Sequence, residues 1–209
     1  MEVLSVSVTN TISACGYFMS DLVLDHCVMD EKFYAGELIV KRFSGAEDRL
    51  RVTVPEKLMP IVSGNENRMV AVTGQIRSYT KSVNDVPRLV VTVFVLDISP
   101  VSSDDTTNEV LLDGTICRDP VYRTTPFGRE ICDLMIAVNR NYGKSDYIPC
   151  IAWGHNARMI GAMKVGDRIK LEGRLQSRVY QKLTPAGVYE NRVAYEVSVF
   201  GFEVEGASA

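Results

Sequence analysis

The 209-residue sequence lacks the long apolar run that a membrane-spanning helix requires. No stretch approaches the roughly 18 uninterrupted apolar residues that cross a bilayer, and residues 1–5 lack the basic start of a signal peptide. Hydrophobic residues make up 46% of the chain and charged residues 23%, which is ordinary for a globular protein. We therefore expect a cytoplasmic protein that has no membrane partner.

Cysteine and histidine are scarce, and neither shows the spacing of a metal site. The five cysteines are odd in number and contain no C-x-x-C pair, and His26 and His155 lie far apart in sequence. No P-loop, G-x-S-x-G or H-E-x-x-H motif occurs. The sequence thus predicts buried free thiols, no metal ion or other cofactor, and a protein that is not an enzyme.

Positive charge is also in short supply, because the chain carries a net charge of −3. At first sight this argues against a nucleic-acid partner, since neutralising phosphates requires lysine and arginine. The average hides an asymmetry: residues 1–105 carry −4 and residues 106–209 carry +1, and residues 112–202 alone carry +4. A modestly basic second half therefore follows a modestly acidic first half.

What the sequence does contain is an internal repeat. The pattern at residues 10–16 recurs at residues 108–114, and the pattern at residues 70–76 recurs at residues 169–175. Two copies of a domain of about a hundred residues account for this better than one large domain. Because residues 99–107 are polar and aperiodic, as in a linker, we expect the domains to span residues 1–105 and 106–209.

Each copy predicts an all-β domain. Apolar residues alternate with period two over short runs, as at Leu50, Val52 and Val54, which is the pattern of half-buried strands. Only residues 55–62 and 156–163 look helical, and each segment lies between the third and fourth strands. This order predicts two tandem five-stranded OB-fold barrels, each with a short helix between strands 3 and 4. Alternation alone does not separate this barrel from other small barrels.

Short motifs of the second copy occur in a fixed order, at residues 108–114, 118–120, 125–128, 137–140, 146–154, 164–167 and 172–178. Each motif is weak alone, but in this order and spacing they resemble the bacterial single-stranded DNA-binding protein family. The resemblance covers nearly the whole second copy, about residues 108–204. It implies sequence-tolerant binding and protection of single-stranded DNA in replication, recombination or repair.

The resemblance also implies a set of binding residues. Proteins of this family stack bases on aromatic rings, at positions that correspond here to Tyr142, Tyr147, Trp153 and Tyr180. Basic residues interleave with these rings and would follow the DNA backbone: Arg140, Lys144, Arg174, Arg178 and Lys182. Independently, Tyr147 and Trp153 lie six positions apart and should share one strand face. Singly, such a ring is more often packed in a core, and such an arginine is often only solvated.

The first copy departs from this pattern. Our alignment places Val54 where the second copy has Trp153, and Arg49 or Leu50 where it has Tyr147. We therefore expect the first copy to have a structural or protein-binding role. An alternative function for the whole chain is a protein-interaction or primosome-type accessory module with weak nucleic-acid affinity. RNA also remains open as a ligand, because stacking is indifferent to the sugar.

The family generally works as four OB folds around a symmetric centre. A chain that contains two would reach this number as a homodimer, the commonest closed symmetry of soluble oligomers. The resemblance thus implies a homodimer presenting four OB folds, with single-stranded DNA as the main partner and replication or repair proteins as further partners.

Overall fold

The computed structural model describes residues 9–19, 22–65, 68–83, 85–101, 105–140, 143–184 and 187–204. In the first half of the chain the strands are β1 (Asn10–Phe18), β2 (Val23–Val28), β3 (Glu31–Lys41), β4 (Glu47–Pro55), β5 (Val70–Val83) and β6 (Val86–Pro100). In the second half they are β7 (Asn108–Ile116), β8 (Val121–Thr124), β9 (Glu130–Asn139), β10 (Ser145–Trp153), β11 (Arg168–Leu183) and β12 (Tyr189–Val204).

Short helices interrupt the strands at one point in each half. The 3-10 helix η1 (Glu56–Leu58) and the helix α1 (Met59–Ser63) lie between β4 and β5, and the helix α2 (Gly154–Gly161) lies between β10 and β11. Both segments occur where the sequence predicted them, although α2 begins and ends two residues before the predicted bounds. Pro60 lies in the first turn of α1, where its missing N–H costs no hydrogen bond.

Five strands in each half pair into a closed ring. In the first half the ring runs β1–β3–β4–β6–β5 and back to β1, with β4 and β6 parallel. In the second half it runs β7–β9–β10–β12–β11 and back to β7, with β10 and β12 parallel. The predicted fold, two tandem five-stranded OB barrels with a helix after the third strand, is confirmed. The short strands β2 and β8 add to the outer edges of β3 and β9 and were not predicted.

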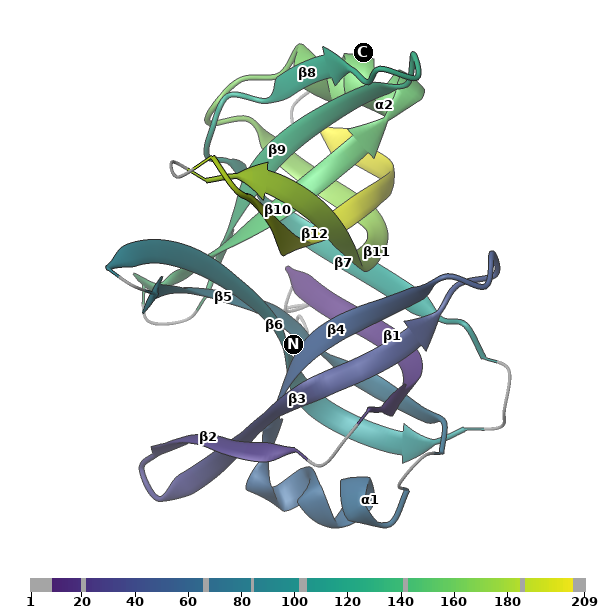
Figure 1. Ribbon diagram of the computed structural model, residues 1–209, viewed down its shortest axis with the longest axis vertical. Coiled ribbons are helices and arrows are strands. Elements are labelled where there is room, and N and C mark those ends of the chain that lie inside the picture. The colour runs from purple at the N-terminus through teal and green to yellow at the C-terminus, as the bar shows by residue number, and fades with distance from the viewer. Residues whose placement is uncertain are drawn as a thin grey trace, which may run out of the picture.

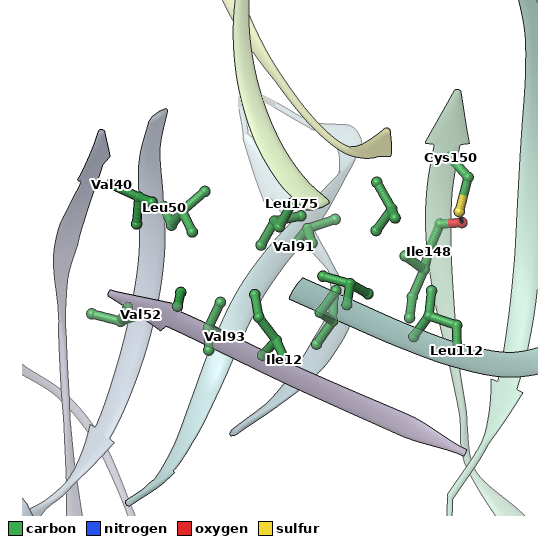
Figure 2. Packing of buried hydrophobic residues seen from close by; sticks show 14 of the residues in the cluster. Ile12, Val40, Leu50, Val52, Val91, Val93, Leu112, Ile148, Cys150 and Leu175 are labelled. Atoms are coloured by element: carbon green, nitrogen blue, oxygen red, sulfur yellow. Dashed lines mark hydrogen bonds between the residues drawn. The ribbon is translucent and has the colours of Figure 1, made fainter. Parts of the chain in front are cut away.

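Alternating side chains fill the two barrels. Along β4, Leu50, Val52 and Val54 are buried while the residues between them are more exposed, as a period-two strand with one inward face requires. Buried residues of both halves belong to one hydrophobic cluster, some of whose members are drawn in Figure 2. The expected buried thiols are Cys15, Cys132 and Cys150, but Cys27 is exposed on β2.

The internal repeat is visible in matching contacts. The Asn10 side chain donates to the Ile76 carbonyl at 2.7 Å and accepts from the Ile76 amide at 2.9 Å. Asn108 does the same with Leu175, at 2.8 and 3.0 Å. These asparagines hold the same place in the two copies, bridging the first and fourth strands of each ring.

The two halves meet along β1 and β7, which pair antiparallel and join all twelve strands into one sheet order. In Figure 1 the halves lie one above the other, with β1 and β7 side by side between them. Asn10 pairs with Leu112 and Ala14 pairs with Asn108, so the register is symmetric about the Ile12–Val110 pair. The two copies are therefore related by a local twofold arrangement, like the subunits of an isologous dimer.

Two matching contacts between the halves fix the arrangement further. The Asp48 carboxylate accepts the Ser177 amide at 2.9 Å, and the Ser177 hydroxyl accepts the Arg49 amide at 2.8 Å. The equivalent pair is Asp146, which accepts the Ser78 amide at 2.6 Å, while the Ser78 hydroxyl accepts the Tyr147 amide at 2.7 Å. Both carboxylates are fully buried and have hydrogen-bond partners from the other half, so these contacts join the two halves.

The strand pairings also correct our alignment of the copies. Val52 and Cys150 occupy the same position in their ladders, opposite Val93 and Val197. Counting from this pair, Pro55 stands in place of Trp153, so the alignment of Val54 with Trp153 was wrong by one residue. The same count places Arg49 at the position of Tyr147. The first copy therefore has no aromatic ring at either position.

Candidate nucleic-acid interface

The strand β11 presents the predicted basic and aromatic residues on a single face. Leu175 of this strand is buried in the core, so the residues at even positions point away from the barrel interior. These are the four predicted residues of the strand: Arg174, Arg178, Tyr180 and Lys182. Arg178 and Lys182 are exposed, whereas Arg174 and Tyr180 are half-buried.

A groove with a volume of about 890 Å³ runs beside this face. It brings together three of the predicted residues, Trp153 at the end of β10 and Arg174 and Arg178 on β11. The strand motifs did not point to three further residues that line it: Phe200 on β12, Arg129 before β9, and Arg42 from the first half. Phe200 is 54% exposed beside the buried Val199, and this outward position on a period-two strand is a signal that could have identified it.

Trp153 and Tyr147 share one face of β10, as predicted. The ladder between β9 and β10 runs from Ser145 to Trp153 without a register shift, so alternate residues keep their orientation. Trp153 is 38% exposed and Tyr147 is 49% exposed, large fractions for aromatic rings. Trp153 lines the groove, whereas Tyr147 lies near the other end of the strand and is not among the groove residues.

Arg174 supplies positive charge to the groove, whereas the neighbouring Arg42 is paired with the buried Asp48 carboxylate, to which its Nε donates at 2.7 Å. The Arg174 guanidinium lies 5.5 Å from the centre of the Phe200 ring, within the range of a cation–π contact. Burial, followed by the nearby charge of Arg42, lowers the pKa of Arg174. Arginine nevertheless stays protonated at neutral pH. Arg174 forms no salt bridge within the described part of the chain, so its charge can attract an anionic ligand.

Two of the predicted arginines are already paired with carboxylates. The Arg178 guanidinium donates to both carboxylate oxygens of Glu196, at 3.1 and 3.4 Å, and this bonding raises the pKa of Arg178. The Arg140 Nε atom lies 3.0 Å from the buried Asp146 carboxylate. The positive charge of these two arginines is thus largely compensated within the protein.

The remaining predicted residues within the described ranges are not among those that line the groove. Tyr180 is in reach of the Arg178 guanidinium, whose central carbon lies 5.7 Å from the centre of the tyrosine ring. Lys144 is exposed in the turn between β9 and β10, where its carbonyl accepts the Arg140 amide at 2.7 Å. Tyr142 falls outside the described residues.

The described ranges contain neither a metal-binding cluster nor a membrane-spanning helix. No group of three or more histidine, cysteine, aspartate or glutamate residues there could hold a metal ion. Within the same part of the chain, no helix has the length and apolar character needed to cross a membrane.

Comparison with known proteins gives this surface a context. The sequence model of the Single-strand binding protein family matches residues 107–203. A single-stranded DNA-binding protein of Oceanobacillus iheyensis is 33% identical over 107 residues, which cover 48% of this chain and 66% of that protein. Single-stranded DNA-binding protein A of Bacillus subtilis is 31% identical over 96 residues, 43% of this chain and 56% of that protein. The chain thus spans less than two thirds of these relatives' length.

A third relative and one solved structure complete the comparison. Single-stranded DNA-binding protein 2 of Listeria monocytogenes is 30% identical over 113 residues, which cover 49% of this chain and 71% of that protein. The crystal structure of wild-type single-stranded DNA binding protein from Thermus aquaticus superimposes with a TM-score of 0.73 at 19% identity, covering 96% of this chain and 94% of that one. At that identity the likeness concerns the fold, which includes both halves. On the strength of the family match and the Listeria relative, the chain belongs to the single-strand binding protein family.

Proposed function

We propose that this protein binds single-stranded DNA without strong sequence preference and protects it during replication, recombination or repair, and that it is not an enzyme. The observation that carries the proposal is the groove in which Trp153 and Phe200 lie together with Arg42, Arg129 and Arg174. Exposed rings offer stacking surfaces to unpaired bases, and guanidinium groups attract the phosphates between them. The proposed domains are residues 1–105 and 106–209; the second supplies most of the groove, and the first adds Arg42.

Stacking rather than charge is expected to dominate the affinity. Stacking contributes about 1–3 kcal/mol per base, and it tolerates any sequence because every base has a flat face. Arg178 and Arg140 are compensated by Glu196 and Asp146, so fewer cations are free than the sequence suggested. We therefore expect the affinity to fall as salt rises, but less steeply than the number of basic residues alone would predict.

A fluorescence titration tests the proposal, because Trp153 is the only tryptophan in the chain. Addition of oligo-dT is expected to change the Trp153 emission at concentrations where a duplex of equal length does not. The affinity should fall as salt rises, with a slope of log K against log salt near −0.7 for each phosphate neutralised. Charge reversal of Arg178 should place a second negative charge beside Glu196 and weaken binding. Equal responses to oligo-dT and duplex, or no response, would favour the accessory-module alternative.

We also propose that the protein forms a homodimer that presents four OB folds. The face formed by β7, β11 and β12 holds a shallow depression lined by Leu111 and Phe202, and Leu111 is 55% exposed. An exposed leucine beside a half-buried aromatic ring, with charged residues such as Lys170 and Glu203 around them, is suited to contact a second copy.

Light scattering on the intact protein tests this assembly. At micromolar concentration we expect a mass of twice the 23.2 kDa chain. Leu111→Glu should lower the measured mass toward that of one chain, whereas Leu183→Glu, an equally exposed leucine at the end of β11, should not. A parent protein that is monomeric in this concentration range would contradict the proposal.

A further inference from the structure

A second groove, of about 760 Å³, lies between the two halves. The first half lines it with Arg51 on β4 and with residues of the long β5–β6 hairpin: Tyr79, Lys81 and Arg88. The second half lines it with residues of β10, β11 and β12: Pro149, Tyr180, Arg192 and Tyr195. In Figure 1 the β5–β6 hairpin projects from the first half beside the second. Neither half forms this groove alone.

The charges in this groove are less compensated than those in the first one. Among the described residues neither Lys81 nor Arg88 forms a salt bridge. The two residues are also directly opposite each other in the β5–β6 ladder. Like charges at such a position destabilise a sheet. An arrangement of this kind is favourable when a bound anion lies between the two cations.

Aromatic rings accompany these charges, as in the first groove. Tyr79 is 48% exposed on β5, and Tyr180 is half-buried on β11. The Arg51 guanidinium lies 4.6 Å from the centre of the Tyr195 ring, a cation–π contact that joins the two halves. Rings interleaved with cations are the combination that holds a single strand.

The two grooves follow each other along the same pair of strands. Arg178 lines the first groove and Tyr180, two residues further along β11, lines the second. The Arg178 guanidinium lies over the Tyr180 ring, so the contact between these two residues joins the first groove to the second. On β12, Phe200 lies in the first groove and Tyr195 in the second. A strand that leaves the first groove along β11 would therefore enter the second.

We propose that a bound single strand continues from the Trp153 groove into this second groove, where Lys81 and Arg88 of the acidic first half neutralise its phosphates and Tyr79 stacks on a base. The inference rests on the proposed function and assigns the β5–β6 hairpin of the first half a direct part in binding, beyond the contribution of Arg42 to the first groove. It also explains how a half with a net charge of −4 can contact DNA, since two of its cations face each other on one hairpin at the groove.

The test compares short and long oligo-dT on three forms of the full chain: the parent, Lys81→Ala/Arg88→Ala, and the control Lys57→Ala/Arg68→Ala. The control removes the same charge from two exposed positions of the first half: Lys57 lies in η1, and Arg68 lies between α1 and β5. The short oligomer has about 8 nucleotides, within the range of one OB fold, and the long one about 35, enough for two. Binding is measured by fluorescence anisotropy of labelled oligomers at several salt concentrations.

For Lys81→Ala/Arg88→Ala we expect the affinity for the long oligomer to fall on the order of 10-fold. The slope of log K against log salt should become less negative by about 1.4, which is about 0.7 for each cation removed. Affinity for the short oligomer should stay at the parental value, and so should both affinities of the control. Without DNA, the midpoint temperature of thermal unfolding should be no lower than that of the parent, because the repulsion between the two opposed cations has been removed.

The outcomes separate the two proposals. If the parent binds both oligomers and Lys81→Ala/Arg88→Ala binds the long one as tightly as the parent, the second groove is wrong and the proposed function stands. An equal loss in the control would show a general charge effect and would also overturn the inference. If the parent binds neither oligomer, both proposals fail together.

Discussion

Replacing Asp146 with alanine is expected to lower the free energy of unfolding by about 3–5 kcal/mol. The Asp146 carboxylate is fully buried and accepts hydrogen bonds from the Arg77 side chain at 3.0 Å and from the Ser78 amide at 2.6 Å. Arg140 lies 3.0 Å from the same carboxylate. Alanine would leave two guanidinium groups without a counter-charge and one buried amide without an acceptor, which is costly in a low-dielectric interior.

Urea unfolding followed by circular dichroism measures this loss. Asp133→Ala is the matched control, because Asp133 pairs with Arg123 at 2.8 Å on the surface, with about half of the arginine side chain exposed. An exposed pair of this kind contributes at most about 1 kcal/mol. Similar losses in the two variants would show that the Asp146 network does not hold the halves together.

Trp153→Ala and Tyr147→Ala are each expected to weaken single-strand binding by about 1–3 kcal/mol, which is about 5- to 150-fold in affinity. Both rings are exposed on the same face of β10, and Trp153 lines the groove of about 890 Å³. Neither ring fills a barrel, so the fold should be retained. Because the first variant has no tryptophan, the affinity is measured by anisotropy of labelled oligo-dT.

Tyr122→Ala serves as the control for ring removal. Tyr122 is 43% exposed on β8 and outside both grooves, where its hydroxyl donates to Glu130 at 2.5 Å. We expect this variant to bind oligo-dT as the parent does. If the Trp153 and Tyr147 variants are folded and also bind like the parent, the stacking assignment is wrong.

Much of the fold was predictable because its signals are local. Leu50, Val52 and Val54 alternate along one strand, and that spacing alone separates an inward face from an outward one. The repeat was readable because Asn10 and Asn108 make the same pair of backbone hydrogen bonds, so both copies need asparagine there. The short strands β2 and β8 were missed, since their side chains are exposed and have no apolar alternation.

The candidate site was predictable only along single strands. Arg174, Arg178, Tyr180 and Lys182 share the outward face of β11 because they are spaced by even numbers of residues. Their partners were not predictable in this way. The pairing of Arg178 with Glu196 depends on the register between β11 and β12, which a period-two pattern does not specify.

The sequence by itself thus determined the barrel strands, the repeat and the outward position of the basic and aromatic residues, because each follows from the spacing of neighbours along the chain. The tertiary structure alone decided which of those residues act together. It brought Arg42 of the first half to Arg174 and Phe200, and Arg51 to Tyr195. It also determined which cations are compensated and which are free, because electrostatic energy depends on distances between residues far apart in sequence.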